Sequence, residues 1–319
     1  MEYFPLNCPN PSVNGGDHYN FASVESMMKI LCFLLLVIFL HPVYSQKISR
    51  SGVHLLYTGN LNGALDDCGC GDSVVGGFTR ILSLIDSFRV STSPLLILDG
   101  GDFLSSYSQP RANRVMLHLI SRAGYTALNL GDQEFVESPD FIFKTVQKWK
   151  RSLPFLSHNA GRWNASRHFS QNVMQMKMGK VTISIVGLID PPSFEFISPE
   201  ALRLEEPEVV LRRVAGEINK RNGLQIVLFH GTWDRARALA ERFPWLDVMI
   251  LAHNQHRGFD LWGNTALMES GVDGEYLGYL HAEWKGKRWR FENKFIPVVK
   301  SLPVPGFARK LVDDFYRKP

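Results

Sequence analysis

Four short apolar runs, each ending in glycine or a polar residue, constrain the fold of this chain most strongly. They cover residues 94–102, 125–132, 224–230 and 246–253. Apolar runs of this length that end at turn-forming residues are typical of strands buried on both faces. A sheet with two buried faces needs covering layers on both sides, so the runs predict an α/β protein.

Helix-like segments alternate with these runs. One of them, residues 111–124, ends at Gly124, a typical helix terminator. From Leu261 the segments become β-like, and a short helix is expected at 307–317. We therefore expect an α/β fold of two packed mixed β-sheets flanked by helices, with parallel strands first and antiparallel strands added later. The other helix-like segments are 78–88, 139–151, 206–223 and 234–243.

The N-terminal region has the features of an export signal. Lys29 precedes an apolar run at 30–40, and Ser45 stands at the expected cleavage site. We interpret residues 27–45 as a signal peptide and residues 1–26 as an over-extended N-terminus, which leaves a domain at 46–319. The mature protein is then expected to be secreted or periplasmic. An uncleaved segment would instead attach the chain to a membrane, although its apolar run is short for a membrane span.

Composition excludes a nucleic-acid partner. The net charge is only +4, and the basic residues are scattered along the chain. The densest basic group alternates with aromatic residues, as on the solvated face of a strand; it comprises Lys285, Lys287, Arg288 and Arg290.

Polar side chains end the four apolar runs and can form a metal site. The carboxyl ends of parallel strands meet at one edge of a sheet, where ligand sites form. Two carboxylates and two imidazoles brought to that edge suit Mn, Zn or Fe. The four candidate ligands are Asp102, Asp132, His230 and His253.

Five motifs, in order, resemble those of the calcineurin-like metallophosphoesterases, and of their 5′-nucleotidase branch most closely. They are TGNLNG (58–63), LDGGD (98–102), LGDQEF (130–135), LFHG (228–231) and LAHNQH (251–256). The resemblance covers about residues 52–298. It implies the αββα metallophosphoesterase fold and metal-assisted hydrolysis of a small phosphoester or a nucleotide.

The resemblance implies that one of the family's two metal positions is kept. In the family, a bridging aspartate, an asparagine and two histidines bind this ion. The matching residues are Asp102, Asp132, His230 and His253, with aspartate in place of the asparagine. We therefore expect one divalent ion.

Amides replace the residues of the family's second metal position. The matching residues are Asn60, Asn62 and Gln255, although His256 supplies the last ligand if its loop bulges by one residue. The family's catalytic histidine matches Gln133, which cannot donate a proton to a leaving group. Two metals stabilise both the attacking and the leaving oxygen, so we expect slow hydrolysis of simple monoesters here.

Three asparagines are candidates for contacting substrate. Asn159 matches an asparagine that touches substrate in the family, and it alternatively caps a turn. Asn60 is a candidate for orienting phosphate oxygens, and Asn62 for binding substrate beside it.

The loop after Asn62 carries Cys68 and Cys70, the only cysteines after residue 46. This Cys-Gly-Cys-Gly loop resembles that of an exported, 5′-nucleotidase-like subgroup. Thiolates bind soft or borderline metals. The pair therefore forms a redox or soft-metal site, a local disulfide, or two inert thiols.

Three functions follow from these observations. The leading hypothesis is an exported metallophosphoesterase with one intact metal site. The alternatives are a non-catalytic protein that keeps the fold and binds a metal or ligand, and a redox or soft-metal module that uses Cys68 and Cys70.

Overall fold

A computed structural model of the chain describes residues 52–67, 74–138, 140–149, 153–160, 172–194, 202–218 and 223–317. These residues belong to one compact unit, Ser49–Pro319. The expected over-extended segment 1–26, the signal peptide at 27–45, and Cys68 and Cys70 lie outside the described residues.

Two six-stranded mixed sheets form the centre of the unit, as expected. In the first sheet β1 to β4 are parallel, β11 pairs antiparallel with β1, and β12 pairs antiparallel with β11. Its strand order is β12-β11-β1-β2-β3-β4. The strands are β1 (Val53–Thr58), β2 (Leu95–Asp99), β3 (Ala127–Asn129), β4 (Phe155–Leu156), β11 (Tyr276–Trp284) and β12 (Trp289–Pro297).

The second sheet has the order β5-β6-β7-β8-β10-β9. Its four central strands are parallel, and its two edge strands, β5 and β9, are antiparallel to their neighbours. The strands are β5 (Met174–Met178), β6 (Val181–Ile189), β7 (Gly223–His230), β8 (Val248–Ala252), β9 (Arg257–Trp262) and β10 (Thr265–Ser270).

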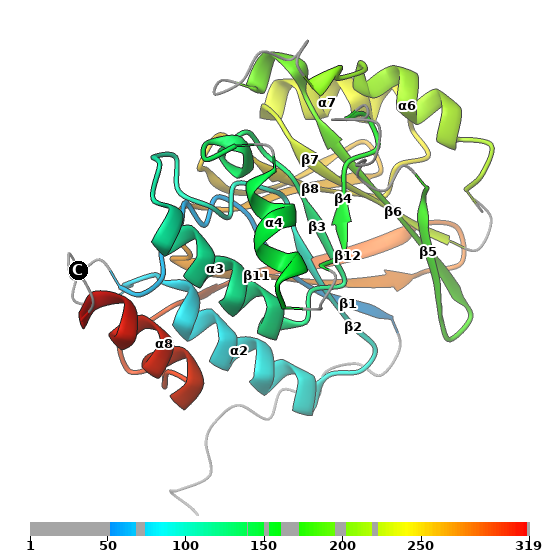
Figure 1. The fold of residues 1–319 in the computed structure, drawn as a ribbon. Helices are drawn as coiled ribbons and strands as arrows, with labels where there is room; N and C mark the ends of the chain where they lie inside the picture. Colours follow the sequence, from blue (N-terminus) through cyan, green and yellow to red (C-terminus); the bar gives the residue numbers. More distant parts are fainter. Residues whose placement is uncertain are drawn as a thin grey trace, which may run out of the picture. The chain divides into compact units, whose positions relative to one another are not determined.

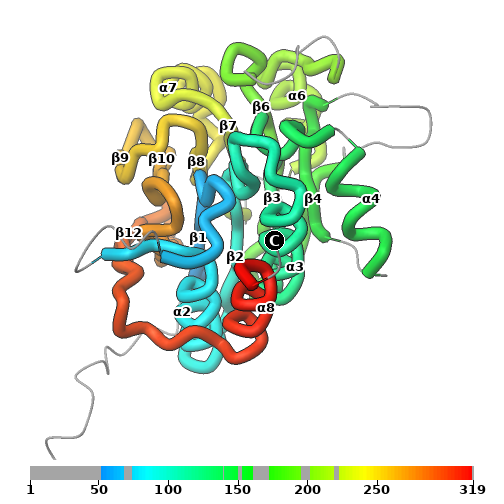
Figure 2. Tube along the Cα trace, turned by 60° about the vertical axis from the view of Figure 1, so that its left-hand side comes forward, coloured from blue at the N-terminus to red at the C-terminus, as the bar shows by residue number. Residues whose placement is uncertain are grey.

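Helices cover the outer face of each sheet, which gives four layers (Figure 1). The first sheet is covered by α2 (Phe78–Ser91), α3 (Pro110–Ala123), α4 (Phe141–Gln147) and α8 (Gly306–Arg317), and the second by α6 (Pro207–Val214) and α7 (Trp233–Arg242). Figure 2 shows the strands between α6 and α7 on one side and α2, α3 and α8 on the other. Within the described residues, none of these helices is both long enough and apolar enough to cross a bilayer.

Side-chain alternation explains why the strands are buried on both faces. On β1, Leu56 packs with the helices, whereas Leu55 and Tyr57 pack between the sheets. Successive strand residues point to opposite faces. Because both faces are covered, every residue of β1 and of β7 is buried.

Local signals set the helix ends. Pro110 and Pro207 occupy the first turns of α3 and α6, where the missing N–H has no helical partner. Gly124 closes α3 in the left-handed conformation, with φ 64°, as its position predicts. Both α4 and α6 are shorter than the segments expected at 139–151 and 206–223.

Parallel strands from both sheets end at one edge of the unit. There, β1, β2 and β3 lead into loops that carry Asn60, Asp102 and Asp132, while β7 ends at His230 and β8 just before His253. The fold therefore brings five predicted site residues to the same edge.

The centre of the first sheet leaves no room for a side chain at Gly278. Gly278 pairs with Tyr57, and a Cβ atom built there would overlap the Tyr57 ring. Tyr57 is fully buried, and its hydroxyl donates to Asn293 Oδ1 at 2.8 Å, so the ring cannot move freely.

We expect Gly278→Ala to lower the free energy of unfolding by about 2 kcal/mol, as overpacking a filled core does. Urea denaturation measures this change. Gly216→Ala is the control, because no atom lies within 4 Å of a Cβ built at Gly216. Equal effects of the two substitutions would contradict the packing described here.

A buried carboxylate and histidine cluster at the strand ends

Asp102, Asp132 and His230 form a buried cluster in which each can offer one ligand atom to a metal. These three atoms all lie within 4.8 Å of one another. The Nδ1 atom of His230 lies 3.6 Å from Asp102 Oδ1, and its Nε2 atom lies 3.4 Å from Asp132 Oδ1. All three residues are buried. The cluster is thus assembled from the ends of β2, β3 and β7.

Glu134 holds the two carboxylate-bearing loops together. Its Oε2 atom accepts hydrogen bonds from the backbone N–H groups of Gly131 and Asp102, at 2.7 and 2.9 Å. Its Oε1 atom accepts from Phe103 and Leu104, at 2.9 and 3.0 Å. Glu134 is almost completely buried. One carboxylate therefore satisfies four buried N–H groups and fixes Asp102 beside Asp132.

The absence of a side chain at Gly131 allows Asp102 and His230 to lie close to the backbone at this position. A Cβ atom built at Gly131 would overlap Asp102 Oδ1 and lie 2.7 Å from His230 Nδ1. Only a residue without a side chain can approach the two ligand atoms so closely.

The cluster concentrates negative charge away from water. Burial raises the pKa of Asp102 well above its usual range; His230 opposes this rise, while Glu134 and Asp132 add to it. Burial lowers the pKa of His230, but the carboxylates of Asp102, Asp132 and Glu134 outweigh it and raise the pKa to about 9. The surroundings thus favour a positive charge at this point.

His253 lies beside the cluster. Its ring centroid is 5.1 Å from that of His230, and the two rings meet edge to face. Its backbone N–H donates to Asn60 Oδ1 at 2.7 Å. His253 is not among the three residues grouped by the 4.8 Å criterion within the described chain, so its expected role as a ligand stays a prediction.

The amides at the second metal position bond to one another and to protein groups. Asn60 Nδ2 donates to Glu269 Oε1 at 2.8 Å and to the carbonyl of Gly271 at 3.0 Å. Asn62 Nδ2 donates to Asp273 Oδ1 at 2.8 Å. Each amide that matches a family ligand in this loop therefore already has protein partners.

Gln133 connects these amides to the cluster. Its Nε2 atom donates to Asn62 Oδ1 at 3.0 Å and to Asp102 Oδ2 at 3.1 Å. The second oxygen of Asp102 thus receives an amide N–H. Since a hydrogen-bond donor and a metal ion compete for the same lone pair, Gln133 covers the side of Asp102 that faces Asn62.

His256 and Gln255 lie on the loop after β8. The His256 ring meets that of Trp233 edge to face, with centroids 5.8 Å apart. Gln255 has a φ of 56°, in the left-handed region. Neither belongs to the three-residue cluster, and the metal-binding role expected for His256 stays a prediction.

Asn159 bonds to the end of β6 and to the segment before α6. Its Oδ1 atom accepts from the backbone N–H of Ile189 at 2.9 Å, and its Nδ2 atom donates to the carbonyls of Ile189 and Glu205. It is also buried, with 1% exposure. Its two expected roles, contacting substrate or capping a turn, stay predictions.

Strained backbone surrounds the cluster. Six non-glycine residues near it have positive φ, a conformation that costs free energy and often occurs at functional sites. They are Asn60 (52°), Asn62 (49°), Asp102 (60°), His253 (123°), Gln255 (56°) and Asp273 (52°).

Three residues that build the site were not predicted from the sequence. Glu134 directly follows Gln133, and Glu269 follows the apolar residues Ala266, Leu267 and Met268 in the buried strand β10. Glu269 is completely buried and accepts from Trp233 Nε1 at 2.6 Å as well as from Asn60. An acidic residue directly after an apolar run in a strand could have indicated Glu269, because a buried carboxylate needs donors. Trp233 gave no such signal.

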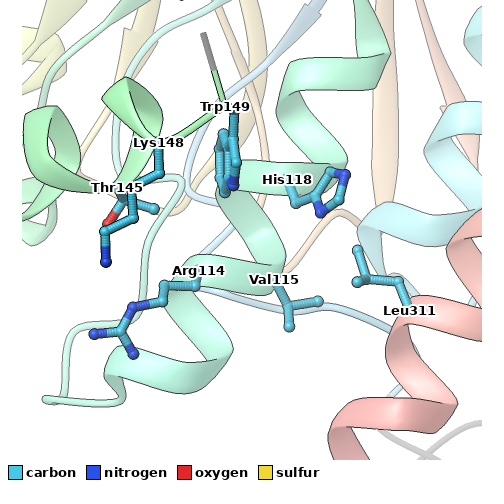
Figure 3. Close-up of a pocket in the computed structure, with 7 residues that line it drawn as sticks. All are labelled: Arg114, Val115, His118, Thr145, Lys148, Trp149 and Leu311. Atoms are coloured by element: carbon cyan, nitrogen blue, oxygen red, sulfur yellow. The ribbon is translucent and has the colours of Figure 1, made fainter. Parts of the chain in front are cut away.

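A hollow of about 230 Å³ lies elsewhere, between α3, α4 and α8 (Figure 3). It is lined by Arg114, Val115, His118, Thr145, Lys148, Trp149 and Leu311. None of the predicted site residues lines this hollow, and it contains no carboxylate.

Comparisons with known proteins identify the fold. No protein-family model matches the chain. A 5′-nucleotidase from Vibrio parahaemolyticus is 26% identical over 155 residues, which are 47% of this chain and 27% of that protein.

Solved structures agree with this fold. A 5′-nucleotidase precursor from Thermus thermophilus matches with a TM-score of 0.68 and 18% identity, over 83% of this chain and 58% of the other. A calcineurin-like phosphoesterase from Bacillus subtilis matches with a TM-score of 0.62 and 15% identity, over 84% of this chain and 97% of the other. The expected metallophosphoesterase fold is confirmed. The chain spans less than two thirds of both 5′-nucleotidases.

We expect Glu134→Ala to lower the free energy of unfolding by more than about 3 kcal/mol, because four buried N–H groups lose their acceptor. Thermal or urea denaturation measures this loss. Glu292→Ala, which removes an exposed carboxylate on β12, is the control and should change stability by less than about 0.5 kcal/mol. A Glu134→Ala protein as stable as the control would contradict the described role of Glu134.

Proposed function

We propose that this chain is an exported, metal-dependent hydrolase that binds one divalent ion, Mn, Zn or Fe, and cleaves a small phosphoester or a nucleotide. The buried cluster of Asp102, Asp132 and His230 carries this proposal. Its position at the strand ends of a fold shared with 5′-nucleotidases supports the choice of chemistry.

The surroundings of His230 fit a metal ligand. Its Nε2 atom lies 3.2 Å from the carbonyl of Ser193, and its Nδ1 atom is buried without a hydrogen-bond partner. Histidines that bind metals usually donate their other ring N–H to a carbonyl or carboxylate. In the neutral ring that a metal requires, donation from Nε2 to Ser193 leaves the Nδ1 lone pair beside Asp102 Oδ1.

The amide network supports a single ion. Asn60, Asn62 and Gln133 are bonded to protein partners, and Gln133 donates to one of the two carboxylate oxygens of Asp102. Neutral amides are also weaker ligands than the carboxylate and imidazole they replace. The retained position is therefore the one with two carboxylates and a buried imidazole.

A divalent ion, when bound, polarises a phosphoryl oxygen and lowers the pKa of water. Asp102, Asp132 and His230 would hold it, and His253 stands next to them. Of the three asparagines predicted to contact substrate, Asn60 and Asn159 are buried, whereas Asn62 is partly exposed. Asn62 is thus the one of the three that a phosphate from solvent would contact first. The amide of Gln133 can donate a hydrogen bond but cannot give up a proton.

Location and partners complete the proposal. Residues 27–45 direct the chain to a secreted or periplasmic location, and a membrane partner follows if this segment is not cleaved. No nucleic-acid partner is proposed.

A non-catalytic, metal-binding role is the second candidate. The closed network of Asn60, Asn62 and Gln133 favours it, because this network occupies the place of the second ion and of the family's acid. The redox or soft-metal alternative depends on Cys68 and Cys70, which lie outside the described residues.

We expect purified protein loaded with Mn²⁺ or Zn²⁺ and then desalted to retain about one ion per chain, as measured by elemental analysis. His230→Ala and Gly131→Ala should each reduce this content to near zero, the first by removing a ligand and the second by filling the cluster. His118→Ala is the control, because His118 lines the separate hollow. Two ions per chain, or equal content in all variants, would contradict the proposed site.

The missing general acid predicts a dependence on the leaving group. We expect p-nitrophenyl phosphate, whose leaving group needs no proton, to be hydrolysed faster than AMP. Gln133→His should raise kcat for AMP by about 100-fold, the typical gain from general acid catalysis, and raise kcat for p-nitrophenyl phosphate much less. Metal-loaded protein without turnover of either compound would instead support the non-catalytic role.

A further inference from the structure

A cationic turn projects from the end of the first sheet that is opposite the metal cluster. The turn joins β11 to β12, and we call residues 284–290 the hairpin tip. Four basic residues lie here that the sequence predicts on a strand face; three of them lie instead in the turn, and only Arg290 lies on a strand, β12. All four are exposed, and Glu283 is the carboxylate that pairs with one of them, Lys285, at 2.7 Å. They are Lys285, Lys287, Arg288 and Arg290.

An exposed indole accompanies these charges. Trp284 is 46% exposed, and its ring meets that of Trp289 edge to face, with centroids 5.4 Å apart. Trp289 is buried and donates from Nε1 to the carbonyl of Gly223 at 3.1 Å. Trp284 therefore packs against the buried ring of Trp289, while much of its own surface faces solvent.

The second sheet adds two lysines to the same end of the unit. Gly223, which bonds to Trp289, pairs with Thr182 near the start of β6. The exposed Lys177 lies near the end of β5, where it pairs with Thr182, and the exposed Lys180 lies in the turn that leads to β6. Figure 1 shows β5 and the turn between β11 and β12 on the same side of the view, to the right.

We propose that the hairpin tip binds the surface of an anionic lipid bilayer. Lys and Arg are attracted to anionic headgroups, and Trp prefers the headgroup region, so a bilayer satisfies both kinds of side chain at once. Single-stranded nucleic acid would instead use a groove with several stacking rings, whereas the hairpin tip offers one exposed indole.

This orientation places a bilayer away from the buried cluster of Asp102, Asp132 and His230. β1 runs from Val53, near the hairpin tip, to Thr58, two residues before Asn60. Six strand residues separate the two ends by about 20 Å. A bilayer at the hairpin tip thus lies at the end of the unit opposite the cluster.

Vesicle sedimentation of the full chain tests the proposal. Partitioning is measured on neutral phosphatidylcholine vesicles and on vesicles with phosphatidylglycerol added, so that binding through the apolar run contributes to both. The triple variant Lys285→Gln/Lys287→Gln/Arg288→Gln should lower the partition coefficient on the anionic vesicles by about 100-fold and leave the neutral value unchanged. Trp284→Ser should weaken binding several-fold with the charge kept.

The matched control removes three exposed cations from other surfaces, in Arg212→Gln/Lys300→Gln/Lys310→Gln. It should lower anionic partitioning by less than tenfold, and thermal unfolding verifies that both triple variants are folded. Equal losses in the two triple variants would overturn the proposal. So would tight, hairpin-dependent binding of a fluorescent oligonucleotide without hairpin-dependent binding to vesicles, which would assign the hairpin tip to nucleic acid.

Discussion

The site depends on one carboxylate that is not itself among the expected metal ligands. The Glu134 carboxylate accepts hydrogen bonds from four backbone N–H groups in the loops after β2 and β3. These bonds hold Asp102 beside Asp132. Parallel strands deliver these loops to one edge of the sheet, but strand direction alone leaves the loops free to diverge. The buried hydrogen bonds remove that freedom, and His230 then completes the cluster from the second sheet.

This arrangement has a cost that a bound cation would offset. Three carboxylates and an imidazole are buried together, and several residues here, Asp102 among them, have positive φ. Buried charges of one sign are unfavourable unless they are paired. Beside them, Asn60, Asn62 and Gln133 form a network of neutral amides at positions that the sequence resemblance matches to a second metal site and a catalytic histidine. Three acids accept hydrogen bonds from this network: Glu269 from Asn60, Asp273 from Asn62, and Asp102 from Gln133.

The fold and the three residues of the buried cluster could be predicted from the sequence, whereas the residues that position them could not. Short apolar runs that end at glycine or a polar residue predicted both sheets, because strands buried on two faces are apolar along their length. The edge strand β9 was missed because its residues are mostly exposed. Asp102, Asp132 and His230 were found from their places at strand ends. Glu134 and Glu269 were missed because their roles depend on backbone N–H and side-chain donors distant in sequence. The position of His253, beside the cluster and turned edge to face against His230, depends on side-chain rotation, which no motif encodes.

Anomalous diffraction from crystals grown with Mn²⁺ tests the central claim most directly. We predict one peak, at bonding distance from Asp102, Asp132 and His230, with Gln133 still hydrogen-bonded to the second oxygen of Asp102. Two peaks bridged by Asp102, or a peak held by other residues, would contradict it.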